Sequence, residues 1–214
     1  MVGIREKLIL GTLALISLVG FGVLTDYSVR PAPPSTVKTS LSLLDLSSME
    51  LDQDERSCVF LFYHPHCPCT LATARNLERL RSAIKVPVSI HAYAFCPSAA
   101  AVQWIESETT RTLQGIEDLT VFPDYGGQKC REYGALTSGQ VCVYNPAGQL
   151  VFSGGLSSGR GHEGENISTR HFIEQLNDQT KSNCIYQPVF GCHILPTSSH
   201  GQSNENFKPL SSRE

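Results

Sequence analysis

The stretch from Cys58 to Thr70, CVFLFYHPHCPCT, decides the fold of this chain. Residues 58–63 form a continuous apolar run, which is typical of a β-strand buried on both faces. His64–Pro65–His66 interrupts the run, and two cysteines follow with one residue between them. The stretch therefore predicts a buried strand that leads directly into a pair of thiols.

An amphipathic helix is predicted immediately after the cysteines. Apolar residues recur every three or four positions from Leu71 to Ile84, with charged residues between them. Pro68 suits the first turn of this helix, because a backbone N–H there has no partner in any case. Cys67 and Cys69 would then lie at the helix amino terminus, whose unpaired N–H groups favour thiolate over thiol.

Strands and helices alternate along the rest of the chain. The predicted elements are a strand at Val86–Phe95, a helix at Ser98–Ile116, a hairpin of strands at Gln140–Asn145 and Gln149–Ser153, a helix at Ile167–Asp178, and a small extra strand at Val121–Phe122. Asn166 or Ser168 is expected to cap the last helix. The pattern predicts an α/β domain with the order β-α-β-α-β-β-α.

An apolar segment near the amino terminus predicts a membrane anchor. Leu8–Leu24 contains seventeen residues without a charge, and Arg5 and Lys7 precede it. As a helix of about 25 Å it reaches the lower limit for a transmembrane segment. The positive residues predict that residues 1–7 stay in the cytoplasm. A cleaved signal peptide is the alternative, although the residues after the run form a poor cleavage site.

Either interpretation places the rest of the chain outside the cytoplasm. We expect a single-pass protein of the inner (cytoplasmic) membrane, with its C-terminal domain facing the periplasm or the cell exterior. Residues 25–56, which include the proline-rich RPAPPS at 30–35, are predicted to be a linker, and 57–195 the folded domain. Residues 196–214, rich in serine, asparagine and charge, are predicted to be a flexible tail.

Composition excludes several classes of protein. A net charge of −3 excludes a strongly basic nucleic-acid binder, so no nucleic-acid partner is expected. Eight cysteines in 214 residues are too few for a disulfide-scaffolded mini-protein and more than core packing requires. Some of these cysteines are therefore expected to carry chemistry.

The order of elements, with cysteines after the first core strand, resembles the thioredoxin-like fold over about residues 57–180. Separated motifs narrow the resemblance to the RedB-type branch of bacterial thioredoxin-like proteins: HPHCPCT (64–70), TSGQVCVYN with PAGQLVFSGG (137–155), SGRGHEGEN (158–166) and PVFGC (188–192). The resemblance implies a mixed central sheet, with parallel first and second strands and a third strand antiparallel to the first. The chain departs from the family in having Cys-x-Cys instead of Cys-x-x-Cys. It also has Thr137–Ser138–Gly139 where the family usually has a cis-proline.

That topology predicts a site at one edge of the sheet, where ligands of open α/β sheets bind. The predicted mechanism is thiol–disulfide exchange with protein thiols or disulfides, in which Cys67 attacks and Cys69 resolves. Cys192 and Cys96 are candidate resolving or third thiols. The side chains expected to line the site are His64, His66, Thr137, Ser138, Arg160, His162 and Glu163.

Two other functions use the same residues. In the first, Cys67, Cys69, His66 and Cys192 bind copper or zinc, as in a metallochaperone. In the second, the domain is a non-catalytic regulatory binding module. The thiol-exchange hypothesis itself needs no cofactor.

The remaining cysteines have separate predictions. Cys58 and Cys142 lie in apolar strands and are predicted to pack as small hydrophobic residues. Cys130 is predicted to lie in a short helix. Cys184 and Cys192, eight residues apart, could form a disulfide, with a place for Cys192 beside Cys67 as the alternative.

Overall fold

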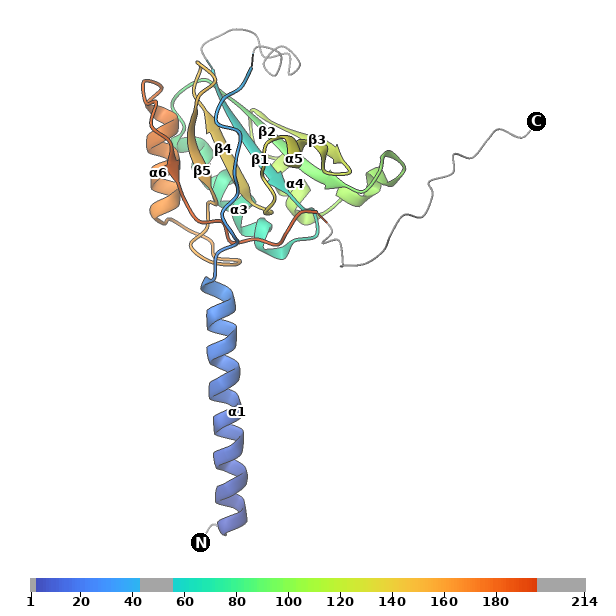
Figure 1. Ribbon diagram of the computed structural model, residues 1–214, viewed down its shortest axis with the longest axis vertical. Coiled ribbons are helices and arrows are strands. Elements are labelled where there is room, and N and C mark those ends of the chain that lie inside the picture. Colours follow the sequence, from blue (N-terminus) through green and yellow to red (C-terminus); the bar gives the residue numbers. More distant parts are fainter. Residues whose placement is uncertain (1–2, 43–55, 196–214) are drawn as a thin grey trace, which may run out of the picture.

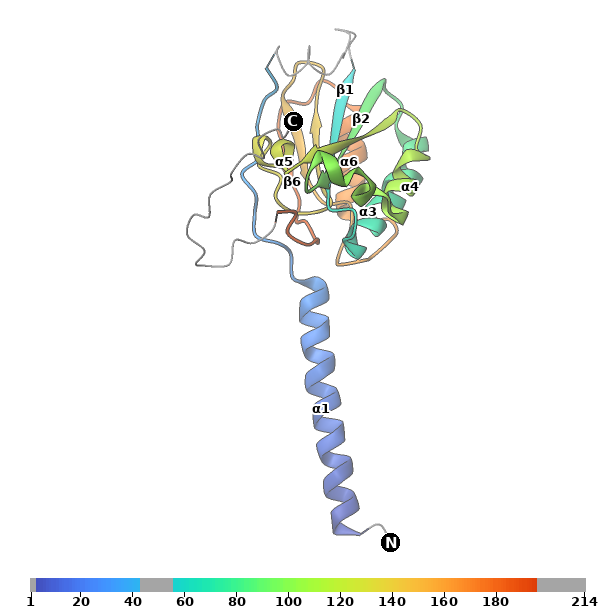
Figure 2. The ribbon, with the colours of Figure 1, turned by 90° about the vertical axis from the view of Figure 1, so that its right-hand side faces the viewer.

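A mixed β-sheet with helices on both faces follows a long amino-terminal helix in the computed structural model, which describes residues 3–42 and 56–195 (Figures 1 and 2). The helices are α1 (Ile4–Val29), α3 (Pro68–Leu80), α4 (Glu108–Gln114), α5 (Gln128–Glu132) and α6 (Ile167–Asn177), with 3₁₀ helices η1 (Arg81–Ala83) and η2 (Ala99–Ile105). The strands are β1 (Ser57–Tyr63), β2 (Val88–Cys96), β3 (Leu119–Tyr125), β4 (Gln140–Tyr144), β5 (Leu150–Gly154) and β6 (Ile185–Tyr186).

The sheet has the topology of the thioredoxin-like fold, as predicted. Its strand order is β3-β2-β1-β4-β5-β6. Strands β1 and β2 are parallel, β4 runs antiparallel to β1, and β5 runs antiparallel to β4. Strand β3 is longer than the predicted extra strand at Val121–Phe122, and the two-residue β6 was not predicted. Both pair in parallel at the sheet edges.

Strand β1 is buried on both faces, which explains its continuous apolar sequence. Val59 and Leu61 face a core that α3, α4 and α6 cover. Phe60 and Phe62 face a second core, which contains Tyr133 and the α5 side of the domain. All seven residues of β1 are buried, so this strand is the centre of the domain.

The prediction of a single helix over Ser98–Ile116 is wrong, because the chain forms two shorter helices there, η2 and α4. Ala101 has non-helical dihedral angles within η2, and Ser107 is extended with φ of −152°. The Ser107 hydroxyl accepts a hydrogen bond from the backbone N–H of Thr110 at 3.1 Å. Serine competes with the helical backbone in this way, so it begins α4 and ends the preceding segment.

Residues 31–42, in the region predicted to be a linker, lie along the domain. The backbone N–H of Ala32 donates to the carbonyl of Val189 at 2.8 Å, and Leu150 N–H donates to the carbonyl of Thr39 at 2.9 Å. Val37 is buried in the second core. The remaining predicted linker at 43–55 and the predicted tail at 196–214 lie outside the described residues.

Helix α1 extends beyond the predicted apolar segment at both ends and has no buried residue. In the part of the chain that the structure describes, it is the one helix long and apolar enough to cross a membrane. Figure 1 shows it leaving the domain as a straight rod. A helix of this length and composition is compatible with the predicted membrane anchor and with the alternative of a signal peptide.

We expect Leu77→Ala to lower the free energy of unfolding by about 2–5 kcal/mol, because Leu77 is fully buried between α3 and the sheet. Urea denaturation of the full chain in detergent, followed by circular dichroism, measures this change. Glu78→Ala is the matched control, since Glu78 is the exposed neighbour and its loss should change stability by less than about 0.5 kcal/mol. Equal effects of the two substitutions would contradict this account of the core.

Candidate thiol site

The turn between β1 and α3 is held by Ser138, which precedes β4. The backbone N–H of His64 donates to the Ser138 hydroxyl oxygen at 2.8 Å. The Thr70 hydroxyl, in the first turn of α3, lies 2.6 Å from the same oxygen. Ser138 belongs to the segment Thr137–Ser138–Gly139, where the sequence pattern lacks the family's usual cis-proline, and the described residues contain no cis peptide bond.

The segment that contains PVFGC docks against this same loop. The backbone N–H of Ser138 donates to the Cys192 carbonyl at 2.8 Å, and Thr137 and His193 form an antiparallel β-bridge. Glycine is required at position 191, because a Cβ there would lie 1.8 Å from the Ser138 carbonyl oxygen. The close approach of the two backbones fixes the position of Cys192.

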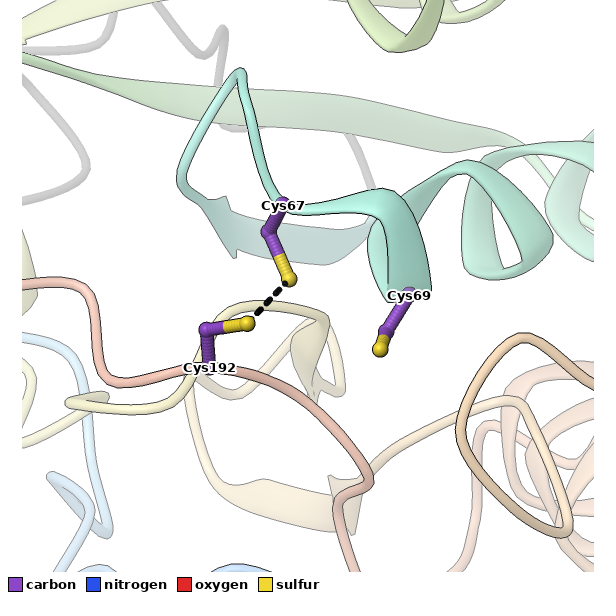
Figure 3. A group of neighbouring side chains, drawn as sticks. All are labelled: Cys67, Cys69 and Cys192. Carbon is purple, nitrogen blue, oxygen red and sulfur yellow. Dashed lines mark hydrogen bonds between the residues drawn. The ribbon is translucent and has the colours of Figure 1, made fainter. Parts of the chain in front are cut away.

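Three sulfur atoms meet at the amino end of α3. Figure 3 shows the side chains of Cys67, Cys69 and Cys192 pointing toward one another. The sulfur atoms of Cys67 and Cys192 are 3.1 Å apart, within hydrogen-bond distance, and all three sulfurs lie within 4.8 Å of one another. Cys67 is only 3% exposed and Cys69 8%, whereas Cys192 is half-buried. Cys192 therefore joins the Cys-x-Cys pair in one group of three thiols.

The surroundings favour a negative charge on Cys67. Burial alone would raise its pKa, but hydrogen bonds from the Cys192 thiol and the Thr70 hydroxyl outweigh this effect. Backbone N–H groups of Cys192 and Cys69 add to them, so the pKa of Cys67 is lower than that of an ordinary thiol. Cys67 is the N-cap residue of α3, where such N–H groups are available.

The other two thiols are held in the neutral form. Burial, together with the negative charge of Cys67, raises the pKa of Cys69, although Arg160 opposes the shift. Burial and the hydrogen bond to Cys67 raise the pKa of Cys192 to about 12. Three thiols so close together cannot all ionise, and the arrangement assigns the first charge to Cys67.

Arg160 connects the glycine-rich loop 154–166 to this site. Its guanidinium group hydrogen-bonds to the Cys69 thiol, and its Nη1 donates to the Gly191 carbonyl at 2.7 Å. The same side chain lies over the ring of Tyr27 in the last turn of α1, 4.7 Å from the ring centroid. Arg160 thus contacts the Cys69 thiol, the docked segment that contains Cys192, and α1.

The two other ionisable residues predicted from this loop lie elsewhere. Glu163 forms ion pairs with Arg75 at 2.7 Å and with Arg79, both on α3. Hydrogen bonds from these arginines lower the pKa of Glu163. The ionised Glu163 side chain therefore joins the loop to α3. His162 is exposed, and its ring lies beside Gly159. Neither side chain belongs to the three-sulfur group.

The two histidines before the cysteines face an aromatic cluster. The His64 ring stacks on Phe95 at 5.5 Å, and the His66 ring meets Trp104 edge-on at 4.6 Å. Burial and the neighbouring His66 lower the pKa of His64, which keeps it neutral at neutral pH. His66 is not among the residues whose ligand atoms gather at the sulfurs. Trp104 on η2 is the residue of this cluster that contacts both histidine rings.

The remaining cysteines are separate from the site. Cys96 donates through its sulfur to the carbonyls of Ser98 and Ala101, so it stabilises the turn after β2. Cys58 and Cys142 are buried in the sheet, as predicted, and burial raises their pKa to about 11 and about 12. Cys130 is buried in the predicted short helix, α5, and its pKa is raised to about 12. All eight cysteines, Cys184 included, are free thiols in this structure.

Comparisons with known proteins support the fold alone. No protein-family model matches the chain, and no curated protein sequence matches it. An uncharacterized conserved protein from Geobacillus kaustophilus superposes with a TM-score of 0.54 at 18% identity, covering 80% of this chain and 93% of the other. A hypothetical protein from Sinorhizobium meliloti also superposes with a TM-score of 0.54, at 14% identity, covering 80% and 97%.

We expect Cys67 to become a thiolate at a lower pH than any other thiol of the group. Because its pKa is lowered, the Cys67 thiolate forms at a lower pH than the thiolate of an ordinary cysteine and is lost as the pH falls through that lowered value. The ultraviolet absorbance of the thiolate, titrated in the wild-type chain and in Cys67→Ser, isolates this ionisation.

Cys192→Ala is the informative variant for this titration. It removes the thiol that donates to Cys67, so the Cys67 curve should move to higher pH. Cys184→Ala is the control, since Cys184 is outside the sulfur group and its pKa is raised by burial. An unshifted curve in Cys192→Ala would show that the contact between the two sulfurs does not stabilise the thiolate.

Proposed function

We propose that this chain is a membrane-anchored, extracytoplasmic protein that carries out thiol–disulfide exchange through Cys67. The observation that carries the proposal is the 3.1 Å contact between the sulfurs of Cys67 and Cys192 at the amino end of α3. The lowered pKa of Cys67 supports it, because the thiolate is the nucleophile in exchange.

In the proposed reaction, the Cys67 thiolate attacks one sulfur of a substrate disulfide. The substrate S–S bond breaks, a mixed disulfide forms, and the departing thiolate takes a proton from water. Cys192, after giving up its proton, then attacks the Cys67 sulfur and releases the second substrate thiol. The substrate gains two electrons and the protein is left with a Cys67–Cys192 disulfide, and the reverse sequence oxidises a dithiol.

Cys69 is the third member of the proposed site. The chain turns into α3 between Cys67 and Cys69, and a disulfide across one intervening residue closes a small ring. Cys192 approaches Cys67 from a separate segment, free of that restriction. We therefore assign resolution to Cys192 and keep Cys69, with its hydrogen bond to Arg160, as an alternative resolving thiol.

The cellular setting is part of the same proposal. Helix α1 would hold the chain in the inner membrane by a single pass, with the domain in the periplasm or at the cell exterior. The exposed apolar surface of α1 supports its placement in a membrane. Arg5 and Lys7, which precede the apolar run, support the orientation. Protein thiols or disulfides are the proposed partners, and membership of the RedB-type branch remains a prediction from the motifs.

We expect Cys67→Ser to abolish exchange with a soluble model disulfide, because no other thiol of the group has a lowered pKa. Cys192→Ser should still attack but should accumulate a mixed disulfide on Cys67, which mass spectrometry detects. Cys130→Ser is the matched control, since its thiol is buried away from the site. A wild-type chain that shows no exchange would refute the proposed reaction.

Gly191→Ala tests the docked segment without removing a thiol. The added Cβ collides with the Ser138 carbonyl, so the segment must move and carry the Cys192 sulfur away from Cys67. We expect this variant to accumulate the same mixed disulfide as Cys192→Ser. Gly22→Ala, in α1, is the companion variant, because its backbone is helical and its added Cβ meets no atom within 4 Å.

A metal site is the second candidate function, because three sulfur ligands lie within 4.8 Å of one another. Cysteine thiolates are soft ligands that suit Cu(I), and three of them complete a trigonal site. Structural zinc takes four ligands, and this group of described residues offers three. The donor set therefore fits copper better than zinc, and Cys67, Cys69 and Cys192 would hold the ion.

If the chain binds copper, the purified protein should take up one Cu(I) per chain in competition with a chromogenic chelator. Cys192→Ser should lose this uptake together with Cys67→Ser and Cys69→Ser, whereas His66→Ala should keep it. Elemental analysis after desalting gives the stoichiometry. Uptake that survives loss of any one of the three cysteines would exclude the trigonal site.

A further inference from the structure

The thiol site lies on the side of the domain from which α1 departs. In both views, the start of α3, the loop after β5 and the C-terminal red segment are at the end of the sheet nearest α1 (Figures 1 and 2). The opposite end of the sheet, where β1 begins, points away from α1. The position of the anchor therefore decides what can approach the thiols.

Arg160 ties the thiol site to the last turn of α1. Its backbone N–H donates to the Ser28 carbonyl at 2.9 Å, and its Nε donates to the Tyr27 carbonyl at 3.2 Å. The guanidinium group also covers the Tyr27 ring and reaches the Cys69 thiol. The Cys69 sulfur is thus separated from the end of α1 by the length of one side chain.

The apolar length of α1 fixes the height of this contact above a membrane. The uncharged run Leu8–Leu24 spans about 25 Å as a helix, while the hydrocarbon core of a bilayer is about 30 Å thick. The whole of Leu8–Leu24 therefore lies within the hydrocarbon core of the bilayer, and the boundary of that core falls at Thr25–Tyr27. Asp26 forms an exposed ion pair with Arg30 at 2.6 Å, as expected of residues among the lipid headgroups.

Tyr27 is the aromatic residue at this boundary, and it is 57% exposed. Tyrosine is enriched at the interface between lipid and water. Ser28, the next residue, is already bound by Arg160, so no length of chain separates the membrane surface from the domain. The loop that bears Arg160 consequently lies at the level of the headgroups.

We propose that the thiol site works at the membrane surface, and that its substrate is a cysteine thiol or disulfide carried there by an integral membrane protein. This inference rests on the proposed function and on the anchor. A partner in the same membrane presents its cysteines at the height of the site. Confinement of both proteins to one surface also raises their effective concentration. A soluble protein must instead enter between the domain and the lipid headgroups.

The test moves the domain away from the membrane surface without changing any residue of the domain. Seven polar, helix-forming residues inserted between Leu24 and Thr25 lift the site by about 10 Å. The insertion also rotates the domain about the axis of α1 by about 700°, which is within about 20° of two full turns. The domain therefore keeps the same side toward the membrane. The matched control carries the same seven residues between Gly3 and Ile4, at the other end of α1. A flexible insertion at the first point is the second variant, should the helical one fail to fold.

A lipid-tethered disulfide tests how far the thiol site lies from the membrane, and a soluble disulfide tests whether the thiols still carry out exchange. Full-length chains are placed in phosphatidylcholine vesicles that contain phosphatidylethanolamine with a pyridyl disulfide on its headgroup. Exchange with this tethered disulfide should fall about tenfold in the raised variant, because the short tether no longer spans the gap. Exchange with soluble glutathione disulfide should be unchanged in every chain, and the control should match the wild type with both substrates.

A headgroup-linked maleimide gives a readout that needs no exchange activity. Mass spectrometry should find it on Cys67, Cys69 or Cys192 in the wild type and much less in the raised variant. Equal labelling and equal tethered exchange in the two chains would overturn the inference. Faster wild-type reaction with a soluble protein disulfide than with the tethered one would also overturn it. Loss of soluble exchange in all chains would instead refute the proposed function, while the labelling would still locate the site.

Discussion

The hydrogen bonds of Ser138 hold the whole site together. The hydroxyl oxygen of this one residue accepts from the backbone where β1 ends and bonds to Thr70 where α3 begins. Its backbone N–H holds the Cys192 carbonyl, and its own carbonyl leaves room only for Gly191. Because Ser138 is buried, each of these polar groups needs its partner, so the three segments are fixed relative to one another.

The distances set by this junction explain the electrostatics of the three sulfurs. A thiolate on Cys67 raises the pKa of both neighbouring thiols, and each neighbour stays neutral while Cys67 is charged. The neutral Cys192 thiol then donates to the Cys67 thiolate. In the proposed reaction, Cys192 attacks the Cys67 sulfur only after that sulfur has formed a mixed disulfide with the substrate. The same short distances suit both the proposed disulfide exchange and the alternative of Cu(I) binding, since both require sulfur atoms that approach closely. The two functions differ in whether two thiols form a bond or three hold an ion.

Two residues of the glycine-rich loop, Arg160 and Glu163, lie close in sequence but make different contacts. Glu163 binds arginines on α3 and fixes the loop to that helix, three residues after Arg160 has turned inward to the sulfurs. Both residues appeared equally plausible as site residues in the sequence. Arg160 is the more central of the two, because it also contacts α1 and the C-terminal segment. One guanidinium group thus connects the thiol site, the last turn of α1 and the docked segment that contains Gly191.

The sequence by itself determined a strand at 58–63, which the structure extends to Ser57, and the cysteines at the start of the next helix. Both follow from local patterns, because apolar runs, helical spacing and turn residues act over a few positions. The topology of the sheet was instead implied by the resemblance to the thioredoxin-like fold, and the structure confirms it. The sequence did not determine the break of the second helix at Ser107, since a side-chain hydrogen bond there overrides the helical pattern. It also left Cys69, Cys192 and Cys96 as competing partners for Cys67, and Cys184 as a possible disulfide partner of Cys192. Only the tertiary structure brought Cys192 to Cys67, because that contact depends on backbone pairing between residues more than fifty positions apart, which sequence spacing does not encode.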